Sequence, residues 1–231
     1  MCGRYTLCVP RARIIEQFRI ARDLTLQENL FERYNIAPSQ KVAAVRIALD
    51  GARELVALRW GLIPHWAKEA KSEYSMINAR SETVAEKPAF RSAFHKRRCL
   101  IPADGFYEWQ VRPGSKLKQP WYIRRKDGEL FAFAGLWERW EPRAGAEGEP
   151  VESCTILVTD ANELVRPIHD RMPVILDPAD YEIWLNPAHD PAALRALLKP
   201  YPAQAMIAWK IGTRVNNPRH DDPACLEAVP N

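Results

Sequence analysis

The chain has 231 residues, 47% of them hydrophobic and 27% charged, as in a soluble globular protein with room for a sizeable core. No stretch approaches the ~18 apolar residues of a membrane span, and Arg4, Arg11 and Arg13 interrupt any secretory signal. We therefore expect a cytoplasmic protein. Its net charge of +4 is compatible with a nucleic-acid partner, although an ordinary solvated surface explains it equally well.

Cysteine and histidine are sparse and scattered. Five cysteines, an odd number, form no C-x-x-C pair, which argues against a disulfide framework. The five histidines lack the spacing of metal ligands. The sequence therefore predicts no metal and no cofactor.

The first half of the chain predicts one helix, one hairpin and one exposed loop. Apolar residues at helical spacing predict a helix over 10–20. Two strand-like runs, 41–49 and 54–60, flank Asp50-Gly51, a strong hairpin signal. The loop that follows carries Pro64-His65-Trp66. Trp66 could stack on a nucleobase, although core packing is the more common role of a tryptophan.

The second half predicts further strands with short helices between them. Phe90 and Phe94 predict a helix over 87–98. Asp127-Gly128 predicts a second hairpin between strands 121–125 and 130–137. The remaining predicted strands are 99–102, 105–110, 153–159, 173–176 and 205–211, with helices over 177–185 and 191–198.

These elements predict one α+β domain. Hairpin-linked strands dominate and no interior linker separates two cores, so we expect a mostly antiparallel, barrel-like β core with flanking helices. We assign residues 1–222 to this domain and 223–231 to a C-terminal tail.

Cys2 follows the initiator methionine. Removal of Met1 would leave an N-terminal cysteine, whose amine (pKa roughly 7.7–8.0) and thiol (about 8.5) are both partly nucleophilic at neutral pH. Such a 1,2-aminothiol condenses with an aldehyde to an imine, and the sulfur then closes a thiazolidine ring. Position alone is weak support, because most cysteines that follow the initiator have no special chemistry.

Glu108 lies in the aromatic strand Gly105-Phe106-Tyr107-Glu108-Trp109. A carboxylate among aromatic side chains is desolvated, which raises its pKa and suits it for proton transfer near neutral pH. The competing interpretation is a glutamate on an edge strand that reaches solvent.

Three other polar residues occupy segments where chemistry is plausible. His169 lies in an irregular segment between two prolines, and a surface histidine paired with Asp170 is the competing interpretation. Asn78 and Arg80 project from one face of an extended segment, where the amide could orient a nucleophile and the guanidinium could bind phosphate. A turn asparagine and a solvated arginine explain this pair equally well.

Taken in order, the motifs resemble the SRAP family, the SOS-response-associated peptidases or abasic-site processing proteins. The matching segments are MCGRY, RYNIAP, WGLIPHWA, INARSET, CLIPADGFYEW, FAGLWE, TDAN and IHDRMPVIL. They span nearly the whole chain, apart from residues 141–150 and the end beyond Asn217. Some members carry two adjacent tryptophans in the loop where this chain has Trp66-Ala67.

The resemblance implies a covalent reaction with damaged DNA. Cys2, freed of Met1, would form a thiazolidine crosslink with the ring-opened aldehyde of an abasic site in single-stranded DNA and shield the lesion. Weak lyase activity and autoproteolytic removal of a leader are implied as side activities. The implied protein is a monomer that acts on single-stranded DNA and single-strand/double-strand junctions, without a membrane, and is nucleoid-associated when it acts.

The resemblance also assigns roles to individual residues. The catalytic residues that it implies are Cys2, Asn78, Glu108 and His169. The DNA-binding residues that it implies are Arg4, Pro38, Trp66, Arg80 and Arg171.

Two other functions remain open from the sequence. Glutamine-hydrolysing amidotransferases with an N-terminal nucleophile also begin Met-Cys-Gly, although Arg4 is an odd residue for a glutamine pocket and suits phosphate. A non-catalytic single-stranded nucleic-acid-binding domain would use only Trp66 and the basic clusters at 11–22, 95–98 and 124–126, and its binding would not survive denaturation.

Overall fold

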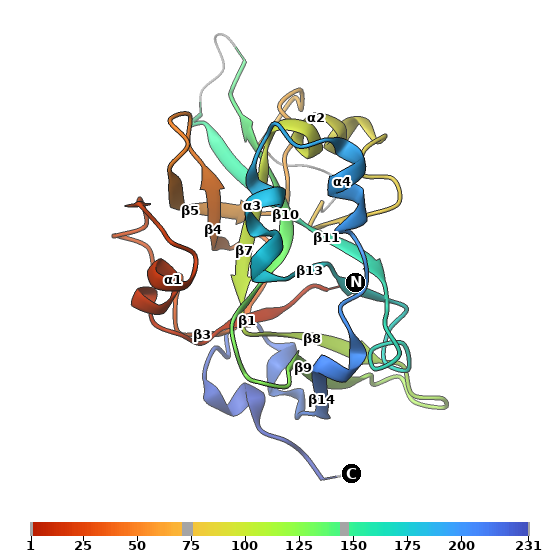
Figure 1. Cartoon of the computed structure of the whole chain (residues 1–231). Coiled ribbons are helices and arrows are strands. Elements are labelled where there is room, and N and C mark those ends of the chain that lie inside the picture. The colour runs from red at the N-terminus through yellow and green to blue at the C-terminus, as the bar shows by residue number, and fades with distance from the viewer. Residues whose placement is uncertain (1, 71–75, 144–147, 231) are drawn as a thin grey trace.

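The fold consists of two β-sheets with short helices around them, as the computed structural model shows for residues 2–70, 76–143 and 148–230 (Figure 1). In the larger sheet, five strands form a barrel. These strands are β4 (Lys41–Ile47), β5 (Arg53–Trp60), β7 (Arg98–Ala103), β10 (Phe131–Trp140) and β11 (Val151–Asp160). The predicted α+β class and barrel-like core are confirmed.

One parallel pairing closes the barrel. β11 runs antiparallel to β10 along one edge and pairs in parallel with β5 through Ser153–Arg59 and Cys154–Trp60. Four short strands extend this sheet at its margins: β2 (Arg22–Asp23), β6 (Asn78–Arg80), β12 (Arg171–Pro173) and β13 (Ile175–Leu176). β6 and β12 both pair with β11, so residues from three distant segments meet there.

The smaller sheet places the N-terminal strand in an interior position. Its strands, in spatial order, are β14 (Met206–Lys210), β9 (Gln119–Arg125), β8 (Gly105–Gln110), β1 (Tyr5–Leu7) and β3 (Arg33–Ile36). β1 therefore has β8 on one side and β3 on the other. Figure 1 shows β1 between the barrel strand β7 and the strands β8, β9 and β14.

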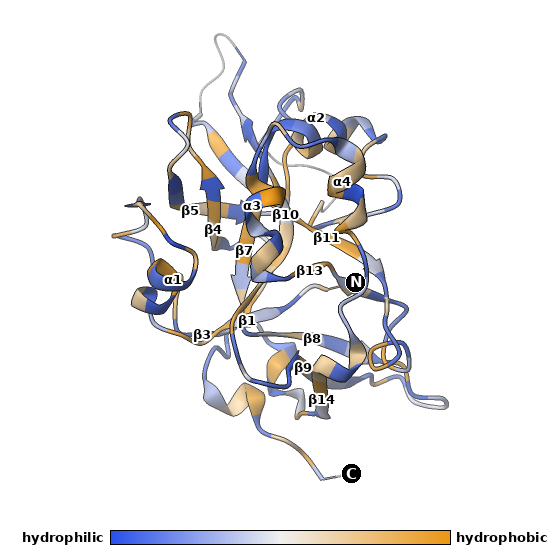
Figure 2. Ribbon diagram, viewed as in Figure 1, coloured by the Kyte–Doolittle hydropathy of each residue, from blue (hydrophilic) through white to orange (hydrophobic). Residues whose placement is uncertain are grey.

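Aromatic packing joins β1 to the barrel. The Tyr5 ring meets Trp60 and Phe133 edge-on, with centroids 5.3 and 5.6 Å apart. All three side chains are fully buried. Figure 2 shows hydrophilic residues prevailing in the peripheral loops, as expected when the strands supply the core.

The helices are short and lie outside the barrel. The α-helices are α1 (Arg11–Gln17), α2 (Pro88–Lys96), α3 (Tyr181–Leu185) and α4 (Pro191–Ala196), and the 3-10 helices are η1 (Pro178–Asp180), η2 (Ala203–Ala205), η3 (Thr213–Asn216) and η4 (Pro223–Leu226). Phe90 and Phe94 of α2 are buried, as predicted. Among the described residues, no helix is long and apolar enough to cross a membrane.

One predicted hairpin is confirmed and the other is wrong. β4 and β5 pair along their length around Gly51, which takes a positive φ of 85°. Gly128 also has a positive φ of 75°, but β9 pairs with β8 and β14, while β10 pairs with β7 and β11. An Asp-Gly signal reports a tight turn. It does not report which partners lie beyond the turn, and here the chain passes from one sheet to the other.

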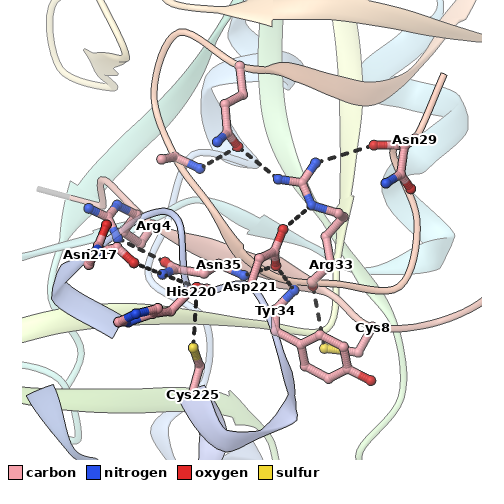
Figure 3. Close-up of polar contacts among 12 residues, drawn as sticks. Arg4, Cys8, Asn29, Arg33, Tyr34, Asn35, Asn217, His220, Asp221 and Cys225 are labelled. Atoms are coloured by element: carbon pink, nitrogen blue, oxygen red, sulfur yellow. Dashed lines mark hydrogen bonds and ion pairs between the residues drawn. The ribbon is translucent and has the colours of Figure 1, made fainter. Parts of the chain in front are cut away.

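The C-terminal segment is fastened to β3 by buried polar contacts (Figure 3). The Asp221 carboxylate accepts hydrogen bonds from the backbone N–H groups of Tyr34 and Asn35 and from Arg33 Nε. The Asn35 side-chain amide donates to the backbone oxygens of Val215, Asn217 and His220. Segments about 180 residues apart are therefore held together by the RYNIAP motif.

The domain boundary at residue 222 stays a prediction. Beyond it, Cys225 is 2% exposed and Trp209 Nε1 donates to the Leu226 oxygen. Val229 N–H donates to the Lys210 oxygen. The chain therefore continues to pack against β14 through most of the predicted tail.

Asp221→Ala should destabilise the protein strongly, because two backbone N–H groups and Arg33 lose one charged acceptor. A hydrogen bond to a charged group contributes about 1.5–3 kcal/mol, so we expect a loss of about 3 kcal/mol, measured as a lower urea midpoint at unchanged slope. Glu129→Ala is the control, since its ion pair with Arg13 is exposed on both sides. Equal effects of the two substitutions would contradict the anchoring role of Asp221.

Candidate functional site

Cys2 is buried at the start of β1, beside β8. β1 and β8 pair antiparallel through Tyr5–Phe106 and Thr6–Gly105, and Tyr107 N–H donates to the Arg4 oxygen at 3.0 Å. This pairing carries the residues before Arg4 alongside Glu108. The Cys2 side chain is fully buried, and its thiol lies close enough to the Glu108 carboxylate for the two charges to interact.

Glu108 is a desolvated carboxyl on an interior strand. β8 lies between β9 and β1, and Glu108 is 2% exposed, so the interpretation as a solvent-facing edge residue is wrong. Burial is the main cause that raises the pKa of Glu108 to about 7, and the nearby charge of Asp170 acts in the same direction. The predicted rise is confirmed. A group with this pKa exchanges protons readily at neutral pH.

Burial disfavours the thiolate form of Cys2. Burial, with the Glu108 carboxylate as a second cause, raises the pKa of the thiol far above the usual range, and the thiol makes a long contact of 3.8 Å to the Arg4 oxygen. The predicted nucleophilicity concerns Cys2 after removal of Met1, so it stays a prediction. The predicted removal of Met1 concerns a residue outside the described ranges.

His169 follows a turn that is tied to β8. Gln110 Nε2 donates to the Pro167 oxygen at 2.9 Å, which connects the end of β8 to the His169 segment. His169 Nδ1 accepts from Arg171 N–H at 3.0 Å and also lies 2.8 Å from Asp170 Oδ1. The first contact needs an unprotonated Nδ1, whereas the second needs a protonated one.

The neutral form of His169 is the favoured one. Burial lowers the pKa of His169; Asp170 opposes this shift, and the positive charge of Lys118 adds to it. In the neutral ring, Nδ1 accepts from Arg171 and the proton lies on Nε2. Nε2 can then donate a hydrogen bond. The competing pairing of His169 with Asp170 is also present, but Asp170 is 85% exposed.

Asn78 and Arg80 lie on β6, next to the middle of β11. β6 pairs in parallel with β11 from Asn78–Ile156 to Arg80–Val158. Asn78 Nδ2 makes a long contact of 3.5 Å to the Ile156 oxygen, while its buried Oδ1 meets no donor among the described residues. Ala79 is buried and Arg80 is exposed, so the two polar side chains share the face away from the core, as predicted.

Two of the three predicted phosphate-binding arginines already have partners. Arg171 pairs with Glu82 and lies 3.2 Å from Asp160, so a phosphate would have to compete with two carboxylates. Arg4 Nη1 donates to Asn35 Oδ1 at 2.9 Å and to the Val215 oxygen at 2.7 Å. Its partners are neutral, and its charge is therefore not cancelled (Figure 3).

Trp66 and Pro38 lie on two different loops, and Trp60 is next to one loop in sequence and hydrogen-bonded to the other. Trp66 is 55% exposed, unlike the fully buried Trp60, so it is not a core residue. Pro38 is half-buried in the turn after β3, and Ser39 N–H in that turn donates to the Trp60 oxygen at 2.8 Å. Trp60 leads directly into the loop that carries Trp66.

The sequence did not reveal what holds this loop. Glu138 on β10 is 4% exposed and accepts from Arg97 at 2.6 Å, and it lies 3.1 Å from His65 Nδ1. Trp140 Nε1 donates to the Ala67 oxygen at 2.9 Å. These partners are about 70 residues from the loop, and no spacing rule links them.

The described residues contain no cluster of three or more histidine, cysteine, aspartate or glutamate side chains that could hold a metal ion. What they do bring together is an acid–base set. Electrostatic interactions connect Cys2 to Glu108, Glu108 to Asp170, and Asp170 to His169. Asn78, Arg80 and Arg171 come from the two strands that flank β11.

The sequence of this chain matches a known family. The model of the SOS response associated peptidase (SRAP) family matches residues 1–218. The chain belongs to the SRAP family. The motifs that carried the resemblance therefore identified the family correctly.

SRAP relatives of similar length are known from bacteria. "Abasic site processing protein YoqW" from Bacillus subtilis is 48% identical over 231 residues, covering 99% of this chain and all of the relative. "Abasic site processing protein HMCES" from Gallus gallus is 38% identical over 200 residues, covering 77% of this chain and 58% of that protein. A crystal structure of a protein from Bacteroides thetaiotaomicron superposes with a TM-score of 0.88 at 30% identity, covering 99% of this chain and 100% of that one.

Glu108→Gln should change stability in a pH-dependent way. The folded pKa of about 7 lies above the ordinary value of 4.5, so between these limits the folded protein holds a proton that the unfolded chain has lost. Wild-type stability therefore falls as pH rises through this window. The uncharged variant should gain up to about 3 kcal/mol relative to wild type by pH ~7.

Urea unfolding of both proteins across this window measures the difference. Glu129→Gln, which replaces an exposed carboxylate, serves as the control and should give a flat difference. A flat difference for Glu108→Gln as well would mean that this carboxyl is not desolvated in the folded protein.

Proposed function

We propose that this protein processes abasic sites by forming a covalent crosslink between Cys2 and the ring-opened sugar in single-stranded DNA. The observation that carries the proposal is the burial of Cys2 beside Glu108, whose pKa of about 7 suits proton transfer. The names of the SRAP relatives give the proposal its substrate class.

The proposed reaction begins with opening of the abasic sugar. Glu108 moves the proton of the C1′ hydroxyl to the ring oxygen, which gives the aldehyde. Neutral His169 assists this step by donating a hydrogen bond from Nε2 to the sugar oxygen. The Cys2 amine, freed by loss of Met1, then attacks the aldehyde carbon and forms a carbinolamine.

Glu108 moves the protons in the next two steps. In its protonated form it donates to the departing hydroxyl, so that water leaves and an imine forms. The resulting carboxylate then accepts the thiol proton as Cys2 sulfur adds to the imine carbon. Glu108 is needed as a base in this step because the pKa of the buried Cys2 thiol is raised, so the thiol does not lose its proton without a base beside it. The net change is condensation of amine, thiol and aldehyde to a thiazolidine with release of one water.

The other site residues hold the reactants. The buried Oδ1 of Asn78 is a suitable acceptor for an amine N–H, and we assign it that role. Arg4, Arg80 and Arg171 are proposed to bind phosphates that flank the lesion, with Arg171 exchanging a carboxylate partner for phosphate. Exposed Trp66, with Pro38 nearby, is proposed to contact bases.

Four finer properties remain predictions. They are weak lyase activity through the imine, autoproteolytic removal of a leader, action on single-strand/double-strand junctions, and a monomeric state. The location in the cytoplasm, with nucleoid association during DNA damage, is a prediction of the same kind.

Wild-type protein mixed with single-stranded DNA bearing one abasic site should give a shifted band on a denaturing gel. Cys2→Ala should remove the band entirely, because it deletes the sulfur that closes the ring. Cys8→Ala is the matched control, since Cys8 lies just beyond the other end of β1, where its sulfur contacts the Arg33 oxygen, and this variant should crosslink normally.

Other outcomes would overturn the proposal. If the shifted band persists in Cys2→Ala, a residue other than Cys2 forms the covalent bond. Salt-sensitive binding without any band would favour the non-catalytic single-strand binder. Glutamine hydrolysis without any band would favour the amidotransferase.

A further inference from the structure

A hollow of about 420 Å³ lies next to the candidate site, and Arg4 is the one residue of its lining that already has a proposed role. It is formed by the start of β1, the end of β8, the loop between β8 and β9, and η3. The residues that matter here are Arg4, Trp109, Lys116, Leu117, Lys118 and Asn216.

All the charged side chains that line this hollow are positively charged. Three other hollows among the described residues each contain at least one carboxylate: Asp50 and Glu54, Glu182, or Glu138 and Glu141. The lining of the Arg4 hollow has three cations and no acidic residue. Three positive charges around one open space favour a polyanion.

These cations are also not neutralised elsewhere. Arg4 donates only to the neutral oxygens of Asn35, Val215 and Asn216. Among the described residues, no ion pair joins Lys116 or Lys118 to a carboxylate, and both lysines are exposed. All three charges therefore remain available to a ligand.

One wall of the hollow is a fixed aromatic ring. Trp109 Nε1 donates to Asn216 Oδ1 at 2.7 Å, and the Arg4 guanidinium lies 6.0 Å from the ring centroid. Leu117 adds an apolar side chain that is 73% exposed. Cations beside a held aromatic surface are the combination by which proteins bind single-stranded nucleic acid without regard to sequence.

The hollow lies near the candidate site. Arg4 is two residues from Cys2, and Trp109 follows Glu108 along β8, where successive side chains point to opposite faces of the sheet. Lys118 lies close enough to His169 for its charge to act on the imidazole. A strand bound beside His169 can therefore reach the cations of the hollow.

We propose that the hollow between Arg4, Trp109 and the Lys116–Lys118 loop binds the nucleotides on one side of the abasic site. Lys116 and Lys118 contact phosphates, and Trp109 and Leu117 contact the sugar and base. This proposal rests on the proposed function, because the lesion in the site sets which part of the strand reaches the hollow.

The test is the affinity of a Lys116→Ala/Lys118→Ala variant for single-stranded DNA with a tetrahydrofuran abasic analogue. The analogue has no aldehyde, so the measurement reports binding without the covalent step. We expect affinity to fall about tenfold at moderate salt. The slope of log affinity against log salt should decrease by about 0.7 for each phosphate that the variant no longer neutralises.

Lys126→Ala/Lys199→Ala is the control. It removes the same charge from two exposed lysines that line none of these four hollows, and it should bind almost as wild type does. If both double variants lose the same affinity, the effect comes from the overall charge of the protein and not from the hollow, and the proposal is overturned. Unchanged affinity of Lys116→Ala/Lys118→Ala would overturn it as well.

Shortened DNA tests the one-sided geometry. One oligonucleotide lacks the nucleotides 5′ of the lesion and the other lacks those 3′ of it. The difference in affinity between wild type and Lys116→Ala/Lys118→Ala should disappear for only one of the two. A difference that persists in both, or vanishes in both, would contradict a one-sided subsite.

A natural abasic site in the same DNA separates this proposal from the proposed function. At subsaturating DNA, Lys116→Ala/Lys118→Ala should crosslink more slowly than wild type, because it binds the strand more weakly. If wild type forms no crosslink but the variant still loses affinity, the crosslinking proposal fails and the subsite stands. If wild type does not bind single-stranded DNA, both fail.

Discussion

Pairing between β1 and β8 is the constraint on which the site depends. It carries the N-terminal end of the chain into an interior position of the smaller sheet and buries Cys2 beside Glu108. Tyr5 then fixes β1 against Trp60 and Phe133 of the barrel. A chain terminus is normally exposed and mobile, so holding a terminal residue in this way requires partners on both sides of the strand. β3 supplies the second side, and Asp221 and Asn35 fasten the C-terminal segment to it.

Burial raises the pKa of both Glu108 and the Cys2 thiol, but it affects their proposed reactivity differently. It raises the pKa of Glu108 to about 7, where the carboxyl can both give and take a proton. It also raises the pKa of the Cys2 thiol, which makes free thiolate scarce. The same desolvation that disfavours the thiolate therefore provides a neighbouring base. In the proposed reaction the amine therefore attacks first, and the sulfur reacts only once Glu108 has given up its proton.

The sequence predicted the local features and missed the long-range ones. The Asp50-Gly51 turn, the shared face of Asn78 and Arg80, and the aromatic setting of Glu108 depend on neighbouring residues, and each was predicted correctly. The Asp127-Gly128 hairpin failed because strand partners are chosen by the whole sheet. The contacts of Arg4 with Val215, and of Glu138 with His65, join residues far apart in the chain, so no local pattern could reveal them. Family motifs named the candidate site residues, but only the fold shows that two of the arginines already have partners.

The most direct test of the account is to locate the bond in the protein–DNA adduct by mass spectrometry. After protease and nuclease digestion, the adduct should lie on the peptide that begins with Cys2, with a mass equal to peptide plus abasic fragment less one water. Its thiol and its amine should both resist alkylation, because both atoms belong to the thiazolidine ring. An adduct on a lysine, or on a Cys2 peptide whose thiol still alkylates, would contradict the proposed chemistry.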